Sequence, residues 1–130
     1  MPARIFRARS IVGGDEEGEA LVVDAISFYG EVDPATGSLA DGRNLSGKIL
    51  VMKRPRGSTV GAYVLYSLKS NNRHPKAIVT LRSDPVLISG AVIAGIPLYD
   101  RVDEGIFDVV KDGLLVKVNK AGEIIILDTT

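Results

Sequence analysis

A serine and a threonine follow two arginines, a proline and a glycine in the stretch "RPRGST" at residues 54–59, which we call the basic turn. An apolar segment with helical spacing follows, so the sequence predicts that Gly57 and Ser58 lie at the N-terminus of a helix. The first N–H groups of a helix have no partner within it and carry partial positive charge, which favours an anion. Gly57 would let a ligand approach the backbone, and Arg54 and Arg56 add forked donors suited to a carboxylate or a phosphate.

A plain helix cap is the competing interpretation, because Ser58 and Thr59 are both favoured at that position. The pattern alone leaves both interpretations open. It does exclude a nucleoside triphosphate loop, since the spacing G-x-x-x-x-G-K-[ST] is absent. A Ser–His–Asp hydrolase has little support, because the single histidine, His74, is not beside the serine in sequence. If Ser58 is a base, a helix end is too weak to ionise it alone, so an arginine or a partner subunit must help.

Composition narrows the classes of function further. Sixteen basic and sixteen acidic residues give no net charge, whereas nucleic-acid binders carry a basic excess, so we expect no nucleic-acid partner. The absence of cysteine and the single histidine exclude disulfides, thiolate chemistry and a multi-histidine metal site, so we expect no metal in this chain. The stretch at residues 1–14 lacks the apolar core of a signal peptide and no run is long enough to cross a bilayer. We therefore expect a cytoplasmic protein without membrane contact.

Residues 1–130 are expected to form a single domain of mixed α/β class. The patterns predict strands at 4–12, 19–25, 48–53, 76–81, 97–101, 114–118 and 123–127, and a helix at 59–72. The stretch at 84–97 could be a helix or a strand, and the Asp-Pro pair at its start favours a helix. A strand–helix–strand unit in the middle implies a parallel pair with a right-handed crossover, and the flanking strands suggest a second, antiparallel layer. The segment between 26 and 48 is long and irregular, which is typical either of a functional or packed loop or of a plain surface loop.

The two predicted helices have recognisable faces and ends. In the first, Val60, Val64 and Leu68 form an apolar stripe that Tyr63 and Leu65 widen, and Asn71-Asn72 provide a left-handed stop. In the second, Asp84 and the proline after it mark the N-terminus, Gly95 marks the end, and the apolar run between them is expected to be core.

Three stretches together resemble one known family: "SFYGEVDPATG" at 27–37, "GKILVMKRPRGSTVGAYVLYSL" at 47–68 and "SGAVIAGIPLYDR" at 89–101. They are similar to the small subunits of the aconitase-X family, and most of all to those of phosphomevalonate dehydratases of the archaeal mevalonate pathway. The resemblance implies a swivelling β/β/α domain with mixed sheet layers and two main helices. It also implies a large subunit that carries a [4Fe–4S] cluster, and a pair of chains that dehydrates (R)-mevalonate 5-phosphate to trans-anhydromevalonate 5-phosphate.

The same resemblance assigns roles to residues of the basic turn. Ser58, directly after Gly57, takes the place of the family's proton acceptor, and Thr59 that of the neighbouring substrate-binding hydroxyl. The superfamily's arginine shortly after these positions is absent, because Val60 and Gly61 stand there. Substrate anions must then be held elsewhere.

The candidates for holding those anions are Arg54, Arg56 or the large subunit. In the loop before them, Phe28, Tyr29 and Gly30 either line the substrate pocket or an interface, or are simply packed.

Two alternatives to this function remain at the level of sequence. A related subunit could dehydrate another hydroxy acid, such as a hydroxyproline, although those relatives tend to have cysteine after the serine where this chain has Thr59. A non-catalytic swivel or scaffold domain would use Ser58 only as a cap. In the catalytic interpretation the chain is inactive alone, because dehydration needs a Lewis acid as well as a base and this chain has no thiol to hold a cluster.

Overall fold

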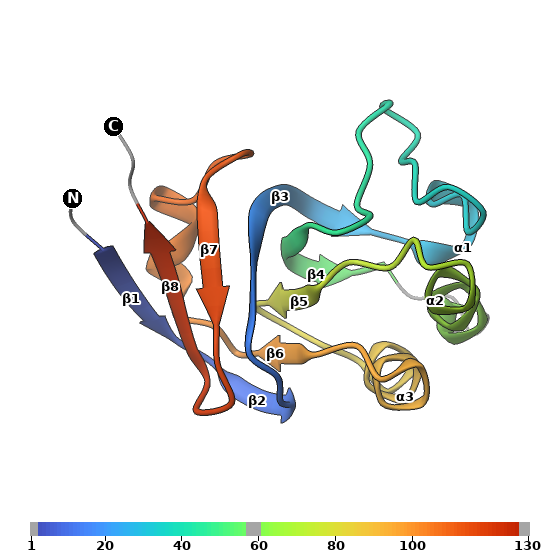
Figure 1. The fold of residues 1–130 in the computed structure, drawn as a ribbon. Helices are drawn as coiled ribbons and strands as arrows, with labels where there is room; N and C mark the ends of the chain where they lie inside the picture. The colour runs from blue at the N-terminus through green and yellow to red at the C-terminus, as the bar shows by residue number, and fades with distance from the viewer. Residues whose placement is uncertain (1–2, 57–60, 128–130) are drawn as a thin grey trace.

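The computed structural model describes residues 3–56 and 61–127. Its main feature is a curled sheet of eight strands in the order β1-β8-β7-β3-β4-β5-β6-β2 (Figure 1). The strands are β1 (Ala3–Arg7), β2 (Arg9–Val12), β3 (Glu16–Ile26), β4 (Ile49–Pro55), β5 (Ala77–Thr80), β6 (Leu98–Asp100), β7 (Leu115–Val118) and β8 (Glu123–Leu127). The central strands β3 to β6 are parallel, while β1, β2, β7 and β8 pair antiparallel, so the predicted mixed sheet is confirmed.

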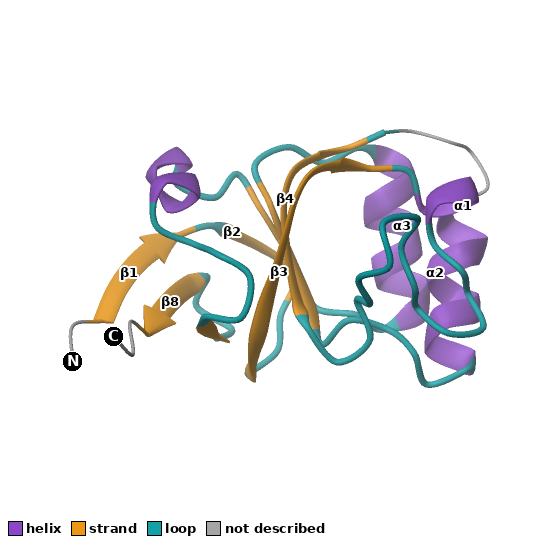
Figure 2. Cartoon of the chain, turned by 90° about the horizontal axis from the view of Figure 1, so that it is seen from above, coloured by secondary structure: helices purple, strands orange, loops and turns teal. Residues whose placement is uncertain are grey.

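The central strands are buried on both faces because their side chains alternate between two cores. Along β4, Leu50 and Met52 face the helices, whereas Ile49 and Val51 face the layer formed by β1, β7 and β8. A strand that is covered on both faces is expected to have a continuous apolar sequence, and β4 has one from Ile49 to Met52. Figure 2 shows the resulting layers, with α1, α2 and α3 on one side of β3 and β4, and β1 and β8 on the other. The β/β/α layering is thus confirmed.

Two helices of the described chain cover the sheet on one side, α2 (Gly61–Ser70) and α3 (Pro85–Ala94). α3 begins and ends where the sequence predicts: the Asp84 carboxylate accepts a hydrogen bond from the Leu87 N–H at 2.8 Å, and Gly95 ends the helix at φ 69°. After α2, Asn72 adopts the left-handed conformation at φ 58°, which confirms the predicted stop. The short helices α1 (Phe28–Glu31) and η1 (Glu104–Asp108) were not predicted.

The prediction of one strand over residues 4–12 is wrong, because the segment divides at Ala8. β1 pairs with β8 and β2 pairs with β6, which stand at opposite ends of the strand order. One continuous stretch of chain therefore joins both edges of the curled sheet. Alternation within a segment predicts extended backbone, but it carries no information about which neighbour each half will pair with.

Two predictions about helix faces are also wrong. Tyr63 is 74% exposed, although it was expected to widen the core stripe of α2. It lies two residues from the buried Leu65, which is about 200° around the helix and thus on the opposite side. In α3 the side chains of Val92 and Ile93 are more than half exposed, because the helix contacts its neighbours through a narrow stripe. That stripe consists of Leu87, Gly90, Ala91 and Ala94.

The long segment between β3 and β4 is packed and ordered. Val32 and Leu39 form an isolated bridge, and both are buried together with Leu45, whose side chain is fully enclosed. Asp33 forms a turn, since its carboxylate accepts the Ala35 N–H at 2.9 Å. This is the packed alternative of the two that the sequence left open. None of the helices in the described ranges is long and apolar enough to cross a membrane.

Candidate active site at the carboxyl edge of the parallel strands

The four parallel strands all end at one edge of the sheet, at Ile26, Pro55, Thr80 and Asp100. α1, α2 and α3 follow β3, β4 and β5 directly. The carboxyl edge of parallel strands is where ligands bind in open α/β sheets, because the loops that follow the strands converge there. The described flanks of the basic turn lie at this edge, since Arg56 comes just after β4 and Gly61 opens α2.

Gly57, Ser58 and Thr59, the centre of the sequence-based prediction, lie outside the described residues, as does Val60. Their flanks are described. The Arg56 N–H donates to the Ile26 carbonyl at 2.8 Å. The chain segments of β3 and β4 are therefore hydrogen-bonded up to the last described residue before Gly57. On the other side Gly61 is buried against Val86 and Phe28. The catalytic role of Ser58 therefore stays a prediction.

The loop residues before the turn are partly packed. Phe28 is 5% exposed and belongs to the helix-side core, where its ring also borders a cavity of about 10 Å³ beside Arg56 and Gly61. Gly30 is exposed and left-handed at φ 92°, a conformation that favours glycine. The side chain of Tyr29 lies outside the described part of the structure. The cavity as it stands is too small to hold a substrate.

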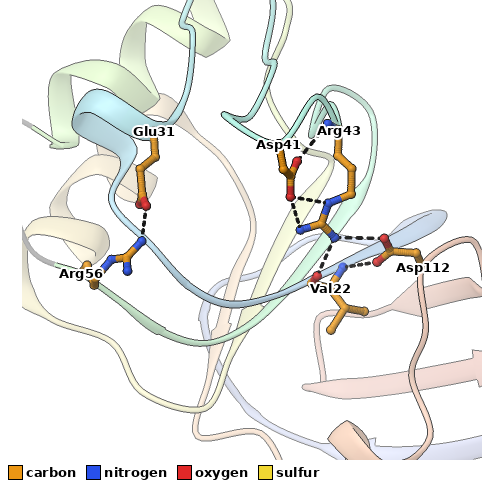
Figure 3. A network of polar contacts seen from close by, with 6 residues as sticks. All are labelled: Val22, Glu31, Asp41, Arg43, Arg56 and Asp112. Carbon is orange, nitrogen blue, oxygen red and sulfur yellow. Dashed lines mark hydrogen bonds and ion pairs between the residues drawn. The ribbon is translucent and has the colours of Figure 1, made fainter.

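Arg56 is held by a carboxylate from the loop after β3 (Figure 3). Its guanidinium forms an ion pair with Glu31, and the other oxygen of that carboxylate accepts the N–H of Ser27. Glu31 therefore fastens both ends of α1 to the strand end that carries the basic turn.

Arg54, the second arginine predicted to bind substrate, also faces a carboxylate. Its guanidinium lies 3.8 Å from Asp24, and Lys53 approaches the same carboxylate at 3.7 Å. All three side chains are exposed, so solvent screens these pairs. Both arginines that the sequence singled out thus already have an anionic neighbour within the chain.

A further polar cluster at this edge was not predicted. Arg9 donates two hydrogen bonds to the two oxygens of Asp100, at 2.8 and 2.6 Å, and the Ser83 hydroxyl donates to the same carboxylate at 2.6 Å. Asp100 is only 1% exposed. The hydrogen bond from Arg9 is the main cause that lowers the pKa of Asp100 below its usual range, against the opposing effect of burial.

This cluster lines an open pocket of about 410 Å³. The lining residues are Arg9, Leu81, Arg82, Ser83, Asp84, Pro85, Ile88, Asp100 and Arg101. Sequence reasoning missed the pocket because Arg9 and Asp100 are 91 positions apart. The one available signal was that Asp100 and Arg101 end a predicted strand at the edge where ligands bind.

His74 is remote from these groups, at the other edge of the sheet, in the connection between α2 and β5. His74 is half-buried, and its Nδ1 is buried without a hydrogen-bond partner among the described residues. Burial is the main cause that lowers its pKa, and Lys69 adds to the effect. Across residues 3–56 and 61–127, no three histidine or carboxylate side chains converge to hold a metal ion.

The sequence of this chain matches one known family. The sequence profile of the "Aconitase X swivel domain" family matches residues 5–127. The chain belongs to this family.

Curated relatives match over nearly the whole chain. The phosphomevalonate dehydratase small subunit of Aeropyrum pernix is 49% identical over 94% of this chain and 92% of its own length. That of Thermococcus kodakarensis is 44% identical over 95% and 96%. Among solved structures, the holo-form of Thermococcus kodakaraensis aconitase X matches with a TM-score of 0.90 and 43% identity, over 96% of this chain and 99% of the matched one. The solution structure of a UPF0107 protein matches with a TM-score of 0.89 and 39% identity, over 96% and 100%.

Proposed function

We propose that this chain is the small subunit of a hydro-lyase that dehydrates (R)-mevalonate 5-phosphate to trans-anhydromevalonate 5-phosphate in isoprenoid biosynthesis. The observation that carries the proposal is the 49% identity to a phosphomevalonate dehydratase small subunit, which spans 94% of this chain and 92% of the relative. An end-to-end match of this kind favours the same division of labour between two subunits. We place the pair in the cytoplasm.

The role of this chain is to supply the base. Dehydration of a β-hydroxy acid requires that a proton leave the carbon next to the carboxylate, and a hydroxyl held at a helix N-terminus can accept it if nearby positive charge favours the alkoxide. Ser58 is the residue that we assign to this step. Arg56 lies just after β4, two positions before Ser58, and is the nearest described residue to Ser58 in the chain.

The [4Fe–4S] cluster expected for the family does not fit on this chain. There is no cysteine in the sequence, and the described residues offer no convergent carboxylate or imidazole set. We therefore assign the cluster, and with it the departure of the hydroxyl group, to the large subunit. The chain alone is expected to be inactive.

The test is a reconstituted pair of this chain with its large subunit, assayed with (R)-mevalonate 5-phosphate. Ser58→Ala should abolish turnover while the pair still assembles and its melting temperature changes little. Ser89→Ala, an exposed serine on α3, is the matched control and should keep full activity. If Ser58→Ala retains turnover and only lowers stability by about 1 kcal/mol, the serine is a cap and the assignment fails. If the pair turns over a hydroxyproline and not (R)-mevalonate 5-phosphate, the proposed substrate is wrong.

A further inference from the structure

The arginines at the carboxyl edge of the sheet fall into two groups. Arg54 and Arg56 lie opposite Asp24 and Glu31, as described above. Arg82 and Arg101 differ, because within the described ranges neither guanidinium has a carboxylate at ion-pair distance. Both are exposed and both line the pocket of about 410 Å³. Guanidinium groups without an ion pair in the described chain are therefore gathered at this pocket, and Arg101 also stabilises the ionised Asp100 from beyond ion-pair distance.

Backbone hydrogen bonds hold these two arginines in place. The Arg82 N–H donates to the Lys53 carbonyl at 2.9 Å, so the chain after β5 stays attached to β4. The Arg101 N–H donates to the Leu81 carbonyl at 3.2 Å, which fixes the chain after β6 to the same segment. Arg101 has φ 53°, an uncommon conformation for a residue with a side chain, and its neighbours hold it there.

The third arginine of the pocket is fixed by its side chain. Arg9 uses Nε and one terminal nitrogen to grip Asp100, which leaves its remaining N–H groups for another acceptor. Ser83 and Arg9 together occupy the Asp100 carboxylate, so its negative charge is compensated locally. The other carboxylate of the lining, Asp84, is engaged at the N-terminus of α3. The pocket therefore presents three guanidinium groups against two occupied carboxylates.

We propose that this pocket binds the phosphate group of the substrate, with Arg82 and Arg101 as its principal ligands and Arg9 as a fixed third one. The assignment rests on the proposed function for the identity of the substrate. Guanidinium groups bind phosphate oxygens through paired hydrogen bonds, and a phosphate dianion needs more than one of them. The pocket shares Asp84 with the small cavity that Arg56 and Gly61 line, and these are the described residues on either side of the part of the basic turn that carries Ser58. A substrate anchored in the pocket by one end can extend toward that turn.

The first experiment measures kinetics of the reconstituted pair with (R)-mevalonate 5-phosphate. Arg82→Ala and Arg101→Ala should each raise KM tenfold or more with a smaller change in kcat, because a group remote from the reacting carbons contributes binding rather than chemistry. Arg73→Ala, at an exposed arginine between α2 and the amino end of β5, is the control and should change neither constant. Unchanged KM in both pocket variants overturns the assignment. So does a larger effect from Arg54→Ala or Arg56→Ala.

The second experiment does not depend on the reaction. Methyl phosphate is titrated into the full chain and followed by amide chemical shifts, with acetate as the comparison. Methyl phosphate should shift the amides of Arg82, Ser83 and Arg101 in a saturable way, and the shifts should disappear in Arg82→Ala. Equal shifts with acetate, or none at these amides, contradict a phosphate site. If methyl phosphate binds there while the pair does not turn over mevalonate 5-phosphate, the proposed function fails and the pocket remains a phosphate site for another ester.

Discussion

Glu31 and Arg56 form an ion pair across 25 positions of the sequence, and it joins the end of α1 to the residue that leads into the basic turn. The same carboxylate accepts the Ser27 N–H at the start of α1. One side chain therefore sets how the loop after β3 meets the end of β4. We expect this contact to position the residues that follow Arg56 in the chain.

Glu31→Gln tests this positioning role. The substitution keeps an oxygen for the Ser27 N–H but removes the charge that holds Arg56. Because the pair is partly exposed, we expect at most about 1 kcal/mol of lost stability. Turnover by the reconstituted pair should nevertheless fall about tenfold, since small displacements of a catalytic group are costly to rate. The measurement is kcat beside a thermal melt.

Glu123→Gln is the matched control for this substitution. Glu123 of β8 pairs with Arg7 of β1 at 3.6 Å, and neither residue lines the pocket at the carboxyl edge. It should cost as little stability and leave turnover unchanged. Equal activities in both variants would show that the ion pair of Glu31 has no part in placing the turn.

The pH dependence of stability should report on Asp100. Its pKa is lowered in the folded chain, chiefly by the hydrogen bond from Arg9, so folding favours the ionised carboxylate. That contribution is fully present above the unfolded pKa of about 3.9 and is lost as the pH falls through the lower folded value. Asp100→Asn should therefore lower stability at pH 7 and flatten the acid limb of the urea-unfolding profile. A steep acid limb in Asp100→Asn would contradict this role of the carboxylate.

The contact between α2 and α3 requires a glycine at position 90. A Cβ added there would lie 2.7 Å from Leu65 Cδ1 and 3.0 Å from the Ala62 Cα, and the second contact is with backbone that cannot turn aside. Gly90→Ala should thus cost about 1–3 kcal/mol in urea unfolding, in spite of the better helix propensity of alanine. Gly105→Ala is the control, because its nearest neighbour would be 3.8 Å away. A Gly90→Ala chain as stable as the parent would show that the helices can separate at little cost.

Local signals explain which parts of the fold were predictable. The ends of α3 follow from Asp84, its neighbouring proline and Gly95, because caps and stops depend on a few adjacent residues. The parallel strands β4 and β5 follow from short apolar runs. In contrast, the division of residues 3–12 between two sheet edges depends on partners almost the whole chain away, and no local pattern encodes it.

The candidate site shows the same limit. Arg54 and Arg56 were found because they precede a glycine and two hydroxyl residues in sequence, yet each lies opposite an acidic side chain in the fold. Arg82 and Arg101 were missed, since each is an isolated arginine after a strand. Only the parallel order β4-β5-β6 brings them to one pocket. Whether an arginine is available to bind a ligand depends on which carboxylates lie near it in the fold, and the sequence alone does not predict these neighbours.

His74 allows a direct measurement of burial, because it is the single histidine of the chain. Its pKa is lowered first by burial and then by the positive charge of Lys69, against a smaller opposing effect of Glu16. We expect its ring resonances to titrate below about 6.5 in the folded chain and near that value in urea, so acid below about pH 6.5 should reduce stability. Lys69→Gln should raise the midpoint only partly, since burial remains. A folded midpoint at or above the urea value would show that solvent reaches the ring.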